Sequence, residues 1–512
     1  MNIKVQNFLK SIPPLLLEKK ITIIIIFLLS FAIFSINIGS EQIWYDEALS
    51  LHFSQPELPE LIKQIGYNGA EANPPLYHLI IKGARAIFNE NITAFRLISA
   101  FFSSLLAVSL YLFTLNIFDR KTAIISILLL CLNPVIIGFS QEIRMYTLSA
   151  LLCFINISAF YLYLNKAKTL WIVLYAISGI AGLYTQYYFI FTIIITFMIF
   201  ILDSIYKGKF NMKLFLLYIG INTFFLLAFS PWIPSMVNQI KNIAMAKWTE
   251  DITGDILFKI FGYFFSSKFT HDVHPFIPYQ IFTFFALFFS GFAVYSSIKK
   301  GVFIPKTSLL LGSFLIPLLF SIIYSVLFTS IINFRYFVLF APFFFILIAY
   351  GITCFFKGKW PYIITSIYLI FLSPAIFLNY SETFNGSPKN MAYFLNHNIR
   401  QNEKILTFDS GTFLTLNYYI ENQENLYFYS PKRLPPCYGT QLYPQRYVTD
   451  SEIRNILSTS QSHWMVYTPW TKSLIPELLA KENLATDQSL APKIYEHQWS
   501  WPRFKAEHII VK

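Results

Sequence analysis

The chain has 512 residues, of which 55% are hydrophobic, 19% aromatic and only 13% charged. This composition excludes an ordinary soluble domain and is typical of a protein that crosses a membrane many times. The formal net charge of +12 comes mostly from short loops between apolar runs. It therefore indicates contact with anionic membrane lipids, and we expect no nucleic-acid partner.

Apolar runs long enough to cross a bilayer recur along most of the chain, since about 20 helical residues span the hydrocarbon layer. Lys and Arg gather in alternate loops, which predicts a cytoplasmic N-terminus and two large external loops at 39–94 and 234–278. We expect about eleven transmembrane helices, at residues 21–38, 95–117, 121–139, 146–165, 170–187, 188–206, 213–233, 279–298, 306–328, 335–355 and 360–378.

The character of the sequence changes near residue 380, where polar residues increase and no span-length run remains. Short β-like runs occur at 404–408, 463–467 and 508–511, and helical candidates occur at 388–398, 451–457 and 473–481. We therefore predict a polytopic α-helical membrane domain over 1–379 and a small extracytoplasmic α/β domain over 380–512.

Two adjacent carboxylates, Asp46 and Glu47, follow the first apolar run and lie beside Trp44 and Tyr45. Carboxylates at the membrane boundary are costly unless they have a partner or a task. We interpret the pair as catalytic, because neighbouring carboxylates repel and this favours proton acceptance near neutral pH. The alternative is that they cap an interfacial helix that begins at Ala48.

The same external loop continues through Asn73-Pro74-Pro75-Leu76-Tyr77, which predicts a bend followed by an interfacial helix over 76–88. Arg96 opens the second span and Arg335 opens the tenth. Arg96 either has a functional role or extends its side chain to the headgroup region, and Arg335 is either a phosphate contact or such a side chain.

The second external loop carries Gln141, Glu142, Arg144 and Tyr146 within six residues. Arg144 has the geometry to bind a phosphate with two parallel hydrogen bonds. Glu142 is a candidate metal ligand or a counter-charge, and a plain Glu142–Arg144 ion pair at a helix start is the structural alternative.

In this order, the motifs resemble family 39 glycosyltransferases, a group related to protein O-mannosyltransferases and lipid A aminoarabinose transferases. The resemblance covers roughly 20–345 and includes Tyr184–Tyr188, Ser230–Trp232 and Arg335-Tyr336. It implies the GT-C membrane fold and an inverting transfer of a sugar from a polyprenyl-phosphate carrier to a lipid, glycan or protein acceptor. It also implies a site on the periplasmic or luminal face, and we expect a bacterial inner membrane.

The resemblance also suggests roles for individual residues. Asp46 matches the general base, Glu47 would assist it, and Glu142 matches a second acidic position. No cofactor is certain, and a divalent metal ion held by Asp46 and Glu142 stays open. The side chains expected to contact substrate are Tyr45, Tyr77, Arg96, Gln141, Arg144, Tyr146 and Arg335.

Two other function classes compete with a transferase. A transporter or flippase of lipid-linked sugars usually has charged residues near the middle of its spans and repeated halves. The spans here are nearly free of ionisable residues and show no repeat. A membrane-anchored binding protein would leave the acidic loop residues unexplained.

Overall fold

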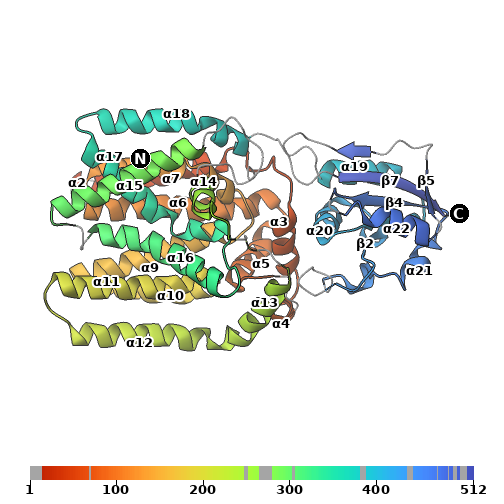
Figure 1. The fold of residues 1–512 in the computed structure, drawn as a ribbon, viewed down its shortest axis with the longest axis horizontal. Coiled ribbons are helices and arrows are strands. Elements are labelled where there is room, and N and C mark those ends of the chain that lie inside the picture. Colours follow the sequence, from red (N-terminus) through yellow and green to blue (C-terminus); the bar gives the residue numbers. More distant parts are fainter. Residues whose placement is uncertain are drawn as a thin grey trace, which may run out of the picture.

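The computed structural model describes residues 14–67, 71–246, 249, 252–264, 279–302, 306–380, 388–434, 442–469, 471–482, 484–487, 493–495 and 504–511. A bundle of long helices forms the larger part, and a mixed sheet with its own helices lies beyond one end of the bundle (Figure 1). The external loop predicted over 234–278 is described only in part, up to Ala246, at residue 249 and from 252 to 264.

Apolar helices build the bundle. Seven of the described helices are long and apolar enough to cross a membrane individually, one bent pair forms an eighth candidate, and three further apolar helices are shorter. Every predicted span overlaps one of these helices or the bent pair, which supports a multi-pass membrane protein. The bundle helices are α2 (Pro14–Ser35), α6 (Ile92–Ile117), α7 (Arg120–Cys131), α8 (Pro134–Ser140), α9 (Tyr146–Lys166), α10 (Thr169–Leu183), α11 (Phe191–Tyr206), α12 (Met212–Phe229), α15 (Tyr279–Lys299), α16 (Ser308–Leu327), α17 (Ala341–Phe355) and α18 (Trp360–Tyr380).

One predicted span is wrong in detail, because residues 121–139 do not form a continuous helix. The segment breaks between α7 and α8, which are bent by 62° relative to each other. Pro134 cannot continue the hydrogen-bond ladder of a helix interior, and the Asn133 side chain accepts hydrogen bonds from Val135 N and Ile136 N to start α8.

Short helices close the end of the bundle that faces the sheet (Figure 1). The helix predicted over 76–88 is confirmed as α5, and its interfacial position stays a prediction. These elements are α3 (Tyr45–Phe53), α4 (Leu58–Tyr67), α5 (Leu76–Phe88), η1 (Tyr187–Ile190), η2 (Ser230–Trp232), α13 (Ile233–Ala246), α14 (Ile256–Tyr263) and η4 (Phe334–Leu339).

The C-terminal part is a seven-stranded sheet in the order β3-β2-β1-β4-β7-β5, with β6 also paired to β7. Strands β1 to β4 run parallel, whereas β7 runs antiparallel to β4, β5 and β6. The strands are β1 (Ile405–Thr407), β2 (Leu426–Tyr429), β3 (Tyr447–Val448), β4 (Ser462–Tyr467), β5 (Leu484–Thr486), β6 (Lys493–Tyr495) and β7 (Phe504–Val511). Its helices are α19 (Pro388–Asn398), α20 (Ser410–Tyr419), η5 (Gln423–Asn425), η7 (Pro444–Arg446), α21 (Ile453–Leu457) and α22 (Leu474–Lys481).

Helix α20 connects this sheet region to the bundle, because it packs directly against α3. The Ile43 N–H, just before α3, donates a hydrogen bond to the Tyr419 hydroxyl at 2.9 Å. The Tyr45 side chain also hydrogen-bonds with Ser410 at the start of α20. The sheet region therefore contacts the helix that carries the acidic pair.

Candidate active site

Glu47 lies in the first turn of α3 and is only 1% exposed. The Arg96 guanidinium donates two hydrogen bonds to its carboxylate, Nε to Oε1 at 2.9 Å and Nη2 to Oε2 at 2.7 Å. The main-chain N–H of Ile143 donates to Glu47 Oε1 at 3.0 Å. Arg96 also donates to the carbonyl oxygens of Ile38, Glu41 and Gln42. This enclosed ion pair ties α3 and α6 to residues 38–42 and to Ile143.

Asp46 precedes Glu47 but meets different surroundings. Its side chain is 15% exposed, and Arg335 Nη1 donates to its Oδ2 at 2.8 Å. Arg335 enters from η4, is 37% exposed, and lies over the Trp44 ring at 4.8 Å from the ring centre. The helix-capping alternative is wrong, because α3 begins at Tyr45 and its N-cap, Trp44, makes no side-chain cap bond.

Two other residues selected from the sequence gather near Arg335. Glu142 and Tyr146 both interact electrostatically with its guanidinium, as does Tyr263 of α14. Glu142 is buried, and its main-chain carbonyl accepts a hydrogen bond from Ser99 at 2.6 Å. Segments that are distant in sequence therefore meet around the Arg335 guanidinium.

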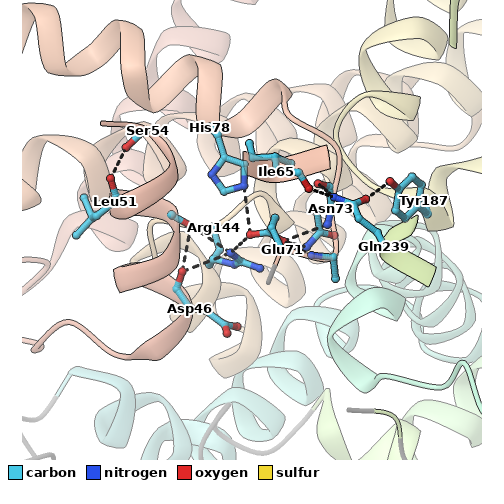
Figure 2. Close-up of polar contacts among 12 residues, drawn as sticks. Asp46, Leu51, Ser54, Ile65, Glu71, Asn73, His78, Arg144, Tyr187 and Gln239 are labelled. Carbon is cyan, nitrogen blue, oxygen red and sulfur yellow. Dashed lines mark hydrogen bonds and ion pairs between the residues drawn. The ribbon is translucent and has the colours of Figure 1, made fainter. Parts of the chain in front are cut away.

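A second buried ion pair lies under the start of α3 and is drawn in Figure 2. Arg144 Nη1 donates to Glu71 Oε2 at 3.0 Å, to Ser50 Oγ at 3.2 Å and to the Asp46 main-chain oxygen at 3.3 Å. The alternative of a Glu142–Arg144 pair is therefore wrong, since the carboxylate bonded to Arg144 is that of Glu71. Arg144 Nε is buried and has no partner among the described residues.

Glu71 is the residue that sequence reasoning missed, although it lies two positions before the predicted Asn73-Pro74 bend. Its Oε1 accepts hydrogen bonds from Ala72 N, Asn73 N and Asn73 Nδ2, and His78 Nε2 lies 3.2 Å from Oε2. Burial alone would raise the pKa of Glu71, but the Arg144 guanidinium, His78 and Asn73 lower it well below its usual range. Glu71 is therefore an ionised anchor for Arg144.

The network continues from Asn73 toward α13 and η1. Gln239 Nε2 donates to the Ile65 carbonyl at 2.8 Å, and its Oε1 accepts a hydrogen bond from the Tyr187 hydroxyl. Figure 2 shows this line of contacts running from Asp46 through Arg144 and Glu71 to Tyr187. The Tyr187 hydroxyl thus has a specific partner, in addition to the aromatic-belt role typical of its position.

Two other predicted substrate contacts have structural partners. Gln141 Nε2 donates to the carbonyl oxygens of Phe34 at 3.1 Å and Ile36 at 2.7 Å, at the end of α2. The Tyr77 hydroxyl pairs with Ser99 Oγ at 2.9 Å, and Tyr77 is 1% exposed. Both side chains fix the walls of the site.

Asp46 and Glu142 were candidates for holding a divalent metal ion. Within the part of the chain that the structure describes, no three His, Cys, Asp or Glu side chains are grouped as a metal site would require. A divalent metal ion held by Asp46 and Glu142 stays an untested alternative.

Comparison with known proteins places this geometry in context. The family model for dolichyl-phosphate-mannose-protein mannosyltransferase matches residues 72–234. No curated protein sequence matches the chain. Apo ArnT from Cupriavidus metallidurans has a similar structure, with a TM-score of 0.58 and 11% identity over 96% of this chain and 98% of that chain.

Two further structures are similar. ArnT bound to undecaprenyl phosphate has a TM-score of 0.56 and 12% identity over 95% of this chain and 97% of that chain. The oligosaccharyltransferase AglB from Archaeoglobus fulgidus, in complex with an inhibitory peptide and a dolichol-phosphate, has a TM-score of 0.50 and 11% identity over 88% and 70% of the two chains. The predicted GT-C architecture is thereby confirmed, and the predicted family resemblance is supported by the family model over residues 72–234.

Proposed function

We propose that the protein transfers a sugar from a polyprenyl-phosphate carrier to an acceptor hydroxyl, with inversion and with Asp46 as the general base. The site would face the periplasm of a bacterial inner membrane. The observation that carries the proposal is the pair formed by Asp46 and Arg335, a partly exposed carboxylate 2.8 Å from a partly exposed guanidinium. This pair supplies a proton acceptor and a phosphate-binding group side by side.

The pair also suggests an order of events. A carrier phosphate offers Arg335 two oxygens for parallel hydrogen bonds, and this geometry favours phosphate as the new partner of the guanidinium. Asp46 then loses its counter-charge and becomes available to the acceptor. Binding of the donor would in this way expose the base.

The transfer itself needs one proton acceptor and no acid. The acceptor oxygen bonds to the anomeric carbon as the bond from that carbon to the phosphate oxygen breaks, and the hydroxyl proton passes to Asp46. The carrier phosphate leaves as an anion, which Arg335 and Arg144 stabilise. Attack opposite the leaving group inverts the anomeric centre.

The surrounding charges support the division of labour between the two acidic residues. Both carboxylate oxygens of Glu47 accept hydrogen bonds from Arg96, and Oε1 also accepts one from the Ile143 N–H. A carboxylate in a closed bidentate pair has no room to take a substrate proton. We therefore assign Glu47 and Arg96 to positioning α3, and we assign the chemistry to Asp46.

A transfer assay tests the proposal. Purified protein in lipid nanodiscs receives a panel of radiolabelled polyprenyl-phosphate sugars and a membrane extract as acceptor, with EDTA or added Mg²⁺ in parallel. We expect transfer with at least one donor and a loss of about 10²- to 10⁴-fold in the Asp46→Asn variant. Asp255→Asn is the matched control, because Asp255 is an exposed carboxylate that directly precedes α14.

Two results would contradict the proposal. Full transfer by Asp46→Asn would remove this residue as the base. Labelled carrier lipid that crosses a liposome bilayer, without transfer from any donor, would instead identify a flippase.

A further inference from the structure

A cavity of about 380 Å³ lies between α3 and α20, where the bundle meets the sheet region. Its volume is in the range of small-molecule sites. One wall comes from the last turns of α3 and the other from α20 and the segments after it. The polar side chains that line it are His52, Gln55, Glu90, Asn417, Tyr418, Gln423 and Tyr443.

One hydrogen bond across the interface and two within the sheet region hold the lining side chains in place. His52 Nδ1 lies 3.0 Å from the Tyr443 hydroxyl, and Asn417 Nδ2 donates to the same hydroxyl at 3.2 Å. Arg446 Nη1 donates to Asn417 Oδ1 at 2.6 Å, and its guanidinium stacks 4.2 Å from the centre of the Tyr443 ring. The arrangement is fixed before any ligand enters, which lowers the entropic cost of binding.

The lining is polar but almost uncharged. Burial, together with Arg446 and Arg85, lowers the pKa of His52 to about 4, so its imidazole is neutral near pH 7. Its Nε2 has no partner among the described residues. Glu90 is paired with Arg85. The described lining residues include no Lys or Arg, and the two nearby guanidinium groups are already bonded, Arg85 to Glu90 and Arg446 to Asn417. The lining itself therefore carries no cation for a phosphate or a carboxylate.

The remaining groups are amides, an imidazole and tyrosine rings, which together offer hydrogen-bond donors, acceptors and flat apolar faces. An apolar chain would leave the amides unsatisfied, whereas a hydroxyl-rich ring can satisfy both kinds of surface. We propose that this cavity binds an uncharged saccharide segment of the acceptor.

The position of the cavity agrees with this assignment. His52 follows Asp46 by six residues on the same helix, so about 9 Å of helix axis separates the cavity from the proposed base. An acceptor glycan held by its inner sugars in the cavity can extend its terminal hydroxyl to Asp46. The inference rests on the proposed function and refines it, because it makes the acceptor a glycan rather than a protein or a simple lipid.

Equilibrium binding tests this inference without relying on catalysis. The protein in nanodiscs is titrated calorimetrically with neutral manno-, gluco- and galacto-oligosaccharides, with uronic-acid oligosaccharides and with a Ser/Thr-rich peptide. The Gln55→Trp variant fills the cavity from its exposed rim. Gln401→Trp is the matched control, since Gln401 is exposed and lies outside the lining.

We expect at least one neutral oligosaccharide to bind the parent and the Gln401→Trp control equally, and to bind Gln55→Trp at least tenfold more weakly. Gln423→Trp should reproduce the loss if Gln55→Trp does not fold. Absence of neutral oligosaccharide binding, binding unchanged in both cavity variants, or stronger binding of the anionic glycans or the peptide would overturn the proposal. Asp46→Asn should retain binding, so failure of the cavity and failure of the proposed chemistry give different results.

Discussion

Asp46 and Glu47 are consecutive residues whose carboxylates have separate partners, Arg335 for Asp46 and Arg96 for Glu47. Consecutive side chains on a helix point about 100° apart, since a turn takes 3.6 residues. One carboxylate therefore faces the interior of the bundle and the other faces the partly exposed cation. We therefore expect replacement of Glu47 to affect the stability of the fold and replacement of Asp46 to affect the reaction.

Replacement of Glu47 with Gln should destabilise the fold. The change leaves Arg96, which is fully buried, without its counter-charge, and loss of one partner of a buried pair typically costs about 3–5 kcal/mol. The unfolding temperature of the variant in detergent should be clearly lower than that of the parent. Glu60→Gln is the control, because Glu60 is half exposed in its pair with Lys63, and unchanged stability in Glu47→Gln would refute the structural role.

Replacement of Arg335 with Lys should weaken use of the donor while the fold is retained. Lysine keeps the charge but loses the planar geometry for two parallel bonds to phosphate, and we expect kcat/KM for the donor to fall about 10- to 100-fold. Steady-state kinetics at varied donor concentration measures the effect. Arg454→Lys is the control, since Arg454 is 74% exposed; equal kinetics in both variants would remove Arg335 from the phosphate site.

Acidification should loosen the contact between α3 and the sheet region. The pKa of His52 is lowered to about 4 in the folded protein, against 6.5 for an ordinary histidine. Its contribution to stability is thus complete above about pH 6.5 and is lost as the pH falls toward 4. Unfolding temperatures should decrease less between pH 7 and pH 5 in His52→Gln than in the parent or in the exposed-site control His397→Gln. Identical pH profiles in the three proteins would contradict this.

Replacement of Gly351 with Ala should separate α15 from α17. An added Cβ would lie 1.8 Å from the Phe289 carbonyl oxygen, so the two helices would have to move apart, at a cost of about 1–3 kcal/mol. Gly220→Ala is the matched control, because nothing lies within 4 Å of that position in α12. We expect a lower unfolding temperature for Gly351→Ala than for Gly220→Ala. Equal unfolding temperatures would show that the α15–α17 packing tolerates the methyl group.

Local patterns along the chain were sufficient to predict the bundle helices, α5 and three of the seven strands. Apolar runs of span length became the bundle helices, and the bend at Pro74-Pro75 preceded α5 with the bounds expected. The strand runs near 405, 464 and 508 also became β1, β4 and β7. These features depend on periodicity, hydrophobicity and backbone restriction within short windows. The break at Pro134 was missed because hydrophobicity alone does not register a bend.

The sequence by itself determined that the protein is a multi-pass membrane helical bundle, and it marked the acidic loop residues as functional candidates. Only the tertiary structure decided the partner of each charge. Asp46 pairs with Arg335 across 289 positions, and Arg144 pairs with Glu71 rather than with Glu142 two residues away. Composition and periodicity carry information about short stretches of the chain. Ion pairs instead form between side chains that packing brings within about 4 Å of each other, whatever their separation in the sequence.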